Sequence, residues 1–307
     1  LVLDEADKML DMGFYDDIME IINSLPKKRQ TLLFSATYEK NTEKLASNVL
    51  INPTIVKVEN EEKVHIKQKF YEVHEDSKTA LIPALISQNK AKSILIFCNM
   101  KIKCDQLADD LYALGLDVLT LHSDLEQKQR DETIILFSNK SYPVLIATDV
   151  ASRGLHIDDV DLVINFDLSL DEKIHTHRIG RTARAGKGGL AISLYTQNDM
   201  DRVFAIKEVF ADIEEENISN VEDDLSYKID SPQRTIFING GKKQKLRAGD
   251  ILGALTAGIG LSKEDIGKID ILDFASYVAI NKEKIAYVLT ELSKSKIKGK
   301  YYRIYEK

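Results

Sequence analysis

The sequence offers little for disulfide bonding, zinc binding or membrane insertion. Only two of its 307 residues are cysteines, Cys98 and Cys104, which are too few for a disulfide framework and lack a nearby second ligand pair for zinc. We therefore predict reduced, structural thiols. No segment approaches the roughly 18 consecutive apolar residues that a membrane-spanning helix needs, and the first residues lack a signal-peptide pattern. These absences predict a cytoplasmic protein without a membrane anchor.

The sequence also lacks a phosphate-cradling Gly-x4-Gly-Lys-Ser/Thr loop. The nearest string begins at Gly180 and has five residues before its next glycine, and no hydroxyl follows Lys187. The chain begins in a strand-like apolar run, Leu1 to Leu3, with no partner strand before it. We therefore expect an N-terminally truncated chain.

Charge is unevenly distributed along the chain. The formal net charge is −7, yet the residues from Arg234 to Lys307 hold 15 Lys and Arg against 8 Asp and Glu, a local charge of +7. The rest of the chain therefore carries −14. A basic tail on an acidic body is typical of an appended module that binds a polyanion such as nucleic acid, although a merely soluble basic surface would look the same.

Short apolar runs alternate with amphipathic helical patterns up to about residue 210. This alternation predicts an α/β fold with parallel sheets flanked by helices. Strands are expected at 31–34, 93–98, 144–148, 162–166 and 190–195, with helices at 103–114 and 127–137 among others. The polar segment 59–63 and the acidic, sparsely apolar segment 211–233 are interpreted as linkers.

The pattern changes after Arg234. The expected order is strand, helix, two strands, helix and strand, at 235–239, 248–257, 268–272, 277–280, 283–293 and 301–305. This is the order of a small α+β domain of the split βαβ type.

Acidic and hydroxyl side chains follow the first two predicted strands. Asp4 and Glu5 come directly after Leu1–Leu3, at the edge of a parallel sheet where ligands of open α/β folds bind. Such carboxylates can hold the Mg²⁺ of a nucleoside triphosphate and orient an attacking water, although acidic residues are also common helix caps. The hydroxyls of Ser35 and Thr37 could bond to Asp7, or simply cap a helix.

The segment from His177 to Arg184 carries three arginines spaced by three, at 178, 181 and 184. This spacing predicts that they lie along one side of a helix. Guanidinium groups make forked, permanently charged contacts with phosphate oxygens, which suits phosphoryl transfer. Two further segments, 127–130 at a predicted helix start and 148–154 after a strand, place polar groups and amides where they could hold a phosphodiester backbone.

Taken in order, these motifs resemble the DEAD-box family of helicases, over Leu1 to about Phe210. The resemblance implies two RecA-like domains, of which 1–58 would be the last part of the first and 64–210 the second, with ATP and Mg²⁺ as cofactors. It implies Asp4 and Glu5 for magnesium and water, Asp7, Ser35, Thr37 and His177 for coupling, Gly154, Arg181 and Arg184 for the nucleotide, and Gln127, Arg130 and Thr148 for RNA.

Two residues depart from the family pattern. His156 stands where the family usually has an Asp that contacts the ribose, which puts that contact in doubt. Ala183 replaces a Gly, a change that a helix accepts.

The C-terminal segment 234–307 resembles the RNA-binding domain of bacterial DbpA-type helicases, which adopts the fold of an RNA-recognition motif. Four basic residues crowd a glycine-bearing turn and are predicted to contact phosphates: Lys242, Lys243, Lys245 and Arg247. Phe237 and Tyr277 could stack on bases, as in other such motifs, or pack in the core. The resemblance implies structured RNA as the partner, in that family a hairpin of large-subunit ribosomal RNA, and a role in ribosome assembly.

The sequence thus predicts an ATP-dependent RNA helicase whose present 307 residues lack ATPase activity. A non-catalytic, truncated RNA-binding protein or scaffold is the alternative. A DNA-directed helicase is disfavoured by Asp4–Asp7, by Ser35–Thr37 and by the C-terminal module.

Overall fold

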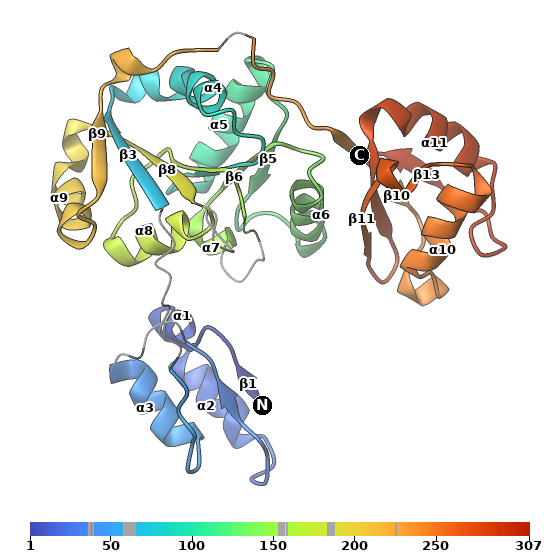
Figure 1. Cartoon of the computed structure of the whole chain (residues 1–307). Coiled ribbons are helices and arrows are strands. Elements are labelled where there is room, and N and C mark those ends of the chain that lie inside the picture. The colour runs from blue at the N-terminus through green and yellow to red at the C-terminus, as the bar shows by residue number, and fades with distance from the viewer. Residues whose placement is uncertain are drawn as a thin grey trace. The chain divides into compact units, whose positions relative to one another are not determined.

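The computed structural model describes residues 1–35, 38, 40–57, 66–152, 157, 159–182, 188–224 and 226–307. The chain divides into two compact units, Leu1–Glu61 and Glu62–Lys307, and each is described by itself (Figure 1).

The described residues of the first unit form a two-stranded parallel sheet and three helices. Its elements are β1 (Val2–Leu3), α1 (Ala6–Asp11), α2 (Tyr15–Asn23), β2 (Leu32–Leu33) and α3 (Lys40–Val49), with Leu3 paired to Leu33. Leu3, Ile18 and Leu45 bring β1, α2 and α3 into one small core. Because β1 and β2 are parallel, the residues that follow them emerge at the same edge.

The second unit begins with a seven-stranded sheet in the order β5-β6-β4-β7-β8-β3-β9. All of its strand pairs among the described residues are parallel. The strands are β3 (Ile66–Glu72), β4 (Ile94–Phe97), β5 (Val118–Leu121), β6 (Val144–Ala147), β7 (Leu162–Asn165), β8 (Gly189–Tyr195) and β9 (Ile213–Glu216). The helices are α4 (Lys78–Gln88), α5 (Lys101–Ala113), α6 (Gln127–Ser138), α7 (Asp149–Ser152), α8 (Glu172–Ile179) and α9 (Met200–Val209).

Both faces of this sheet are covered, as the ribbon shows in Figure 1. Ile94 and Ile96 point into a core that contains residues of α4 and α5. Leu95 and Phe97 point to the other face, where Phe137 of α6 and Ile179 of α8 pack. Strands buried on both sides have no polar face, which is why they appear in the sequence as continuous apolar runs.

Residues 213–216 form a strand although their sequence indicated a linker. β9 pairs in parallel with β3 at the edge of the sheet. Its acidic side chains are tolerated because lysines of β3 neutralise them: Lys67 Nζ lies 3.0 Å from Glu214 Oε2, and Lys69 Nζ 3.0 Å from Glu216 Oε1. The expected linker therefore contributes one edge strand of the seven-stranded sheet.

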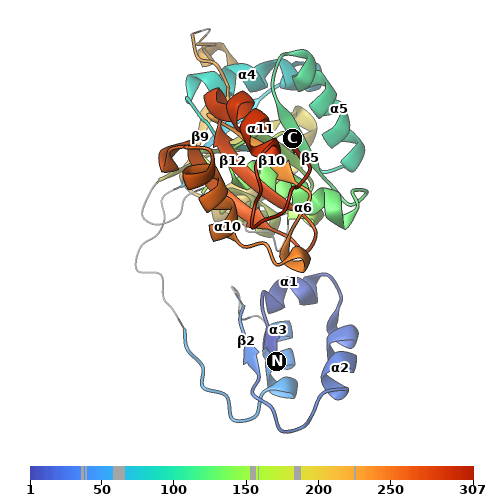
Figure 2. The same ribbon diagram turned by 90° about the vertical axis from the view of Figure 1, so that its right-hand side faces the viewer.

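The C-terminal residues form a second, antiparallel sheet in the order β11-β12-β10-β13. The elements are β10 (Gln233–Ile238), α10 (Ala248–Gly253), β11 (Ile266–Ile271), β12 (Ser276–Asn281), α11 (Ile285–Ser293) and β13 (Ile304–Glu306). This order of strands and helices is the predicted one. Helices α10 and α11 cover one face of the sheet (Figure 2), where Ile251, Val288 and Leu292 meet Ile236 and Val278.

Candidate functional site

The acidic motif of the first unit lies where its two parallel strands end. Asp4 follows β1 and is exposed, Asp7 is buried in the first turn of α1, and Ser35 lies two residues after β2. The backbone N–H of Ala6 donates to the Phe34 carbonyl at 3.0 Å, which joins the two strand ends. The structure thus brings the predicted Asp4, Glu5, Asp7 and Ser35 to one edge, whereas Thr37 lies outside the described residues.

Glu5 has a left-handed backbone, with φ of 52°. A non-glycine residue in this region costs on the order of 1 kcal/mol, and such strain is concentrated at functional sites. The Asp4 carboxylate stabilises the turn by accepting a hydrogen bond from the Glu5 N–H at 3.0 Å. The local geometry therefore fixes the backbone conformation of the turn that carries the two adjacent carboxylates after β1.

In the second unit, Arg178 is the centre of a buried polar network. Its Nε donates to Asp149 Oδ1 at 2.6 Å and its Nη2 to Asp149 Oδ2 at 2.7 Å. Further donations reach the Asp167 carbonyl and Asn99 Oδ1, each at 2.7 Å. The guanidinium carbon also lies 5.1 Å from the centre of the Phe97 ring. With 1% of its surface exposed, Arg178 contacts protein groups and is not placed to contact a phosphate.

The prediction of three arginines along one helix was wrong. Helix α8 ends at Ile179 and is followed by Gly180, so Arg181 comes after the helix. The Arg181 carbonyl accepts from the Val160 N–H at 3.3 Å, and Thr182 Oγ1 donates to the Val160 carbonyl at 2.7 Å. Arg181 is partly exposed, as is His177, while Arg184 and Ala183 lie outside the described residues.

Arg178 joins the segment after β6 to the segment that bears Arg181. Thr148 lies between β6 and α7, and Asp149 is the first residue of α7. The forked pair between Asp149 and Arg178 therefore holds the start of α7 to the end of α8. Sequence analysis grouped Arg178 with the phosphate-binding arginines and gave Asp149 no role. The two residues lie far apart in the sequence, and residue spacing does not reveal which distant side chains contact each other.

The three predicted RNA-contacting residues lie around the ends of β5 and β6. Gln127 and Arg130 occupy the first turn of α6, where Glu126 and Gln129 form a reciprocal cap. Arg130 Nη1 donates to the His122 carbonyl at 3.3 Å, and the Thr148 N–H donates to the Leu121 carbonyl at 3.1 Å. Arg130 and Thr148 are therefore anchored to neighbouring residues, whereas Gly154 and His156 lie outside the described residues.

His175 is a buried residue of α8 that sequence analysis did not select. Its Nε2 lies 2.8 Å from Gln68 Oε1, and because an amide oxygen only accepts, that nitrogen carries the hydrogen. Among the described residues the buried Nδ1 has no hydrogen-bond partner. A second proton there would be desolvated and would lie near Arg178. Burial and, secondarily, the Arg178 charge lower the pKa of His175 to about 4.

This pKa predicts acid sensitivity. In the unfolded chain the pKa of His175 is near 6.5. Between pH 6.5 and 4 the unfolded chain therefore binds more protons at His175 than the folded chain does, and the free energy of unfolding falls as the pH falls. The loss approaches about 3 kcal/mol. Urea unfolding of the wild type and of His175→Gln at several pH values should show this component in the wild type alone, and equal pH slopes would contradict it.

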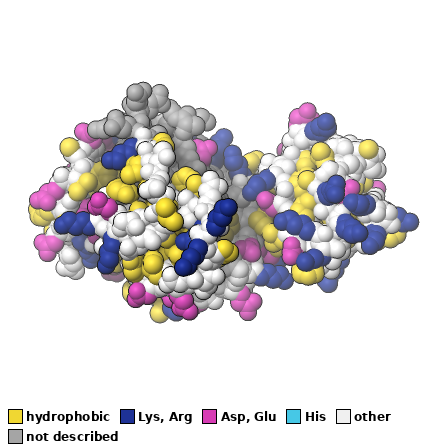
Figure 3. All heavy atoms as spheres, turned by 90° about the horizontal axis from the view of Figure 1, so that it is seen from below, with side chains coloured by type: hydrophobic (Ala, Val, Ile, Leu, Met, Phe, Trp, Pro, Cys, Tyr) yellow, Lys and Arg dark blue, Asp and Glu magenta, His cyan; other side chains and the backbone are white. Residues whose placement is uncertain are grey.

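The predicted basic turn of the C-terminal domain is exposed. Lys242, Lys243, Lys245 and Arg247 are all exposed, and Figure 3 shows Lys and Arg side chains gathered on this domain. Lys298 braces the turn, since its Nζ donates to the Lys245 carbonyl at 2.7 Å and to Asp250 Oδ2 at 3.0 Å. The turn is thus a fixed, positively charged element.

Three features bear on metal and membrane binding. Among the described residues, no group of three or more His, Cys, Asp and Glu side chains could hold a metal by itself, and no helix is long and apolar enough to cross a membrane. Cys98 and Cys104 are free and buried, as predicted for structural thiols.

Comparison with known proteins identifies the family. Residues 1–45 match the family model "DEAD/DEAH box helicase", residues 76–186 "Helicase conserved C-terminal domain", and residues 235–306 "DbpA RNA binding domain". The chain is 41% identical to ATP-dependent RNA helicase DbpA of Escherichia coli over 99% of its own length and 66% of that protein. It is 36% identical to the protein of the same name from Bacillus subtilis, over 99% and 68%.

The solved structures agree with this assignment. S. cerevisiae Dbp5 bound to RNA and ADP BeF3 matches 71% of this chain and 58% of that chain, with 35% identity and a TM-score of 0.62. The chain belongs to the DbpA-type DEAD-box helicases. It spans about two thirds of the length of the two curated relatives named above.

Proposed function

We propose that this chain supplies the RNA-contacting and part of the ATP-contacting surface of an ATP-dependent RNA helicase, in which RNA-stimulated ATP hydrolysis opens an RNA duplex locally. The observation that carries this proposal is the forked ion pair between the buried Arg178 and the partly exposed Asp149. It connects the segment that bears Thr148, a candidate RNA contact, to the segment that bears Arg181, a candidate phosphate contact. Such a link is what coupling of the two ligands requires.

The candidate nucleotide contacts are Asp4, Glu5, Gly154, Arg181 and Arg184. Asp4 would hold the Mg²⁺ of ATP, as the family resemblance implies, because it is an exposed carboxylate and Mg²⁺ prefers oxygen ligands. Glu5 orients a water, and Arg181 and Arg184 stabilise the charge of the transferring phosphoryl group. Asp7, Ser35, Thr37 and His177 couple the two motor domains, and Gly154 contacts the nucleotide. When bound, ATP supplies the phosphoryl group and Mg²⁺ neutralises its charge.

The proposed target is structured RNA, and the family resemblance implies large-subunit ribosomal RNA and a cytoplasmic role in ribosome assembly. The basic C-terminal domain, 234–307, supports this proposal, because the exposed cations of its turn can contact phosphates. In the second RecA-like domain, Gln127, Arg130 and Thr148 bind the RNA strand. The second motor domain covers 64–210 and the preceding part of the first covers 1–58, with 211–233 between the motor and the module.

The 307 residues by themselves hydrolyse no ATP, since they contain no phosphate-cradling loop. RNA-stimulated phosphate release by this chain would refute that statement. A non-catalytic RNA-binding scaffold is the alternative function, and it predicts that the complete protein also lacks ATPase activity.

Simultaneous change of Lys242, Lys243, Lys245 and Arg247 to Ala tests the RNA-binding role. Binding of a structured large-subunit rRNA fragment should weaken. The negative slope of log affinity against log salt should become shallower by about 3, since each phosphate contact contributes roughly 0.7–0.9 to its magnitude. Fluorescence anisotropy over a salt series measures both quantities. A control variant with Lys282, Lys284 and Lys294 changed to Ala should retain most of the affinity. Equal binding by the quadruple variant and the wild type would remove RNA targeting from the turn.

A further inference from the structure

The sheet of the C-terminal domain has one face that α10 and α11 leave uncovered, and aromatic residues occupy it. Phe237 of β10 and Tyr277 of β12 are register partners, with ring centres 5.4 Å apart. Both are nevertheless buried, at 8% and 1% exposure. They pack with Ile135 of α6, a helix of the motor domain. The chain itself therefore covers Phe237 and Tyr277 on this face, while Tyr305, the register partner of Phe237 on β13, is 38% exposed.

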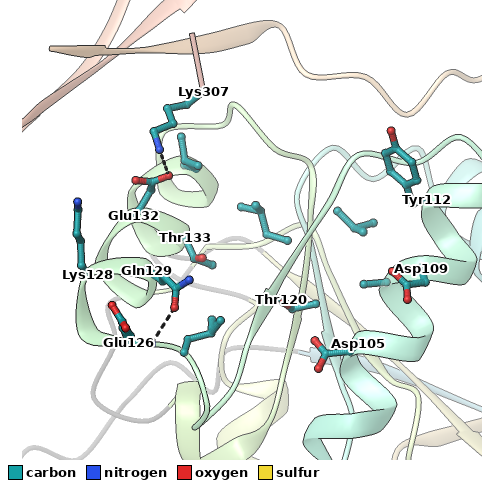
Figure 4. A pocket seen from close by; sticks show the side chains of 15 residues that line it. Asp105, Asp109, Tyr112, Thr120, Glu126, Lys128, Gln129, Glu132, Thr133 and Lys307 are labelled. Atoms are coloured by element: carbon teal, nitrogen blue, oxygen red, sulfur yellow. Dashed lines mark hydrogen bonds and ion pairs between the residues drawn. The ribbon is translucent and has the colours of Figure 1, made fainter. Parts of the chain in front are cut away.

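Polar contacts frame this apolar centre. Glu132 accepts from the Tyr277 hydroxyl at 2.9 Å and from Lys307 Nζ at 2.6 Å, and Figure 4 shows Lys307 reaching Glu132. Asn139 Nδ2 donates to Thr235 Oγ1 at 2.8 Å in a buried position. Burial and Glu132 hold the pKa of the Tyr277 hydroxyl above its usual range.

The contact residues of α6 form one stripe. Glu132, Ile135 and Asn139 follow one another at intervals of three and four residues, which places them on one side of the helix and its end. A fourth contact, Lys268 Nζ to Ser138 Oγ at 3.2 Å, reaches the last residue of the helix. The first turn of the same helix carries Gln127 and Arg130.

We infer that the face of the C-terminal sheet that α10 and α11 leave uncovered is the docking surface for α6, and that α6 remains in contact with this face while the domain binds structured RNA. This inference rests on the proposed RNA-binding function. Phe237 and Tyr277 then act as an interdomain contact and not as base-stacking platforms. Because α6 also carries the candidate contacts Gln127 and Arg130, RNA held by the module is presented to the motor at a fixed position.

A covalent cross-link between α6 and the C-terminal sheet tests whether the two must separate for RNA to bind. Ser138→Cys with Lys268→Cys places one thiol on each side of the contact, and a short bismaleimide can join them. The native Cys98 and Cys104 have 0% exposure and are not expected to react. The cross-linked chain should bind the structured rRNA fragment within about twofold of the same variant whose thiols are capped by a monofunctional maleimide. Loss of binding only in the cross-linked form would show that RNA needs the open face.

The docking contact has its own readout, independent of RNA. Ile135→Asp places an unpaired carboxylate against the two rings, and it should slow cross-linking between positions 138 and 268 by roughly tenfold or more. The control Asp110→Asn, an exposed change on α5, should leave that rate unchanged. Equal cross-linking rates with and without Ile135→Asp would overturn the docking surface. Failure of the capped variant to bind RNA would instead contradict the proposed function, while the cross-linking rates still decide the docking.

Discussion

Replacing Arg178 with Met is expected to lower the free energy of unfolding of the Glu62–Lys307 unit by about 3–5 kcal/mol. The guanidinium is almost fully buried and satisfies both oxygens of Asp149, the Asn99 amide oxygen and the Asp167 carbonyl. A Met side chain keeps part of the apolar stem but donates no hydrogen bond, so the hydrogen bonds from the guanidinium to these acceptors are lost. The Asp149 carboxylate, whose side chain is 16% exposed, then loses the counter-charge of Arg178, which is the costly part of breaking such a pair.

Urea unfolding followed by circular dichroism measures this loss. Arg202→Met is the matched control, because Arg202 forms a more exposed pair with Asp199, at 3.2 Å between Nη2 and Oδ1, and its loss should cost no more than about 1 kcal/mol. Arg178→Lys should be nearly as harmful as Arg178→Met, since an ammonium cannot reproduce the fork. Similar stabilities of the Arg178 and Arg202 variants would show that the network is not holding the domain together.

The strand ends were predictable from the sequence, and the reason is physical. Buried parallel strands such as β4 and β6 are short continuous apolar runs, and the polar residues that follow them must emerge at one edge of the sheet. The positions of Asp4 and Thr148 at the ends of parallel strands therefore followed from local pattern. The family resemblance, based on motif order, was confirmed by the matched family models.

Features that depend on distant partners were not predictable. The acidic residues 213–216 form a strand because Lys67 and Lys69 lie on the neighbouring strand. The third-residue spacing of the arginines suggested one helix, but α8 ends at Ile179 and buries Arg178 against Asp149. Likewise, Phe237 and Tyr277 gave no sequence signal that α6 would cover them, and core packing within their own domain was the competing interpretation.

The second large effect is expected from Arg181→Ala in the complete helicase. If Arg181 stabilises the charge that develops on the transferring phosphoryl group, its removal should lower kcat for RNA-stimulated ATP hydrolysis by about 10³-fold or more. Its side chain is partly exposed, and its backbone is held to Val160, so the substitution should leave the fold intact. Steady-state phosphate release with saturating RNA measures the effect.

The sharper part of this prediction is its separation from RNA binding. Arg181→Ala should retain affinity for the structured rRNA fragment, because the proposed phosphate contacts of the C-terminal domain lie in the basic turn. The quadruple turn variant should lose affinity and keep kcat at saturating RNA. Arg181→Lys should restore little activity, since a point charge lacks the planar fork. If both variants lost affinity and turnover to the same degree, the two sites would not be separable, and the assignment of Arg181 to the phosphoryl group would fail.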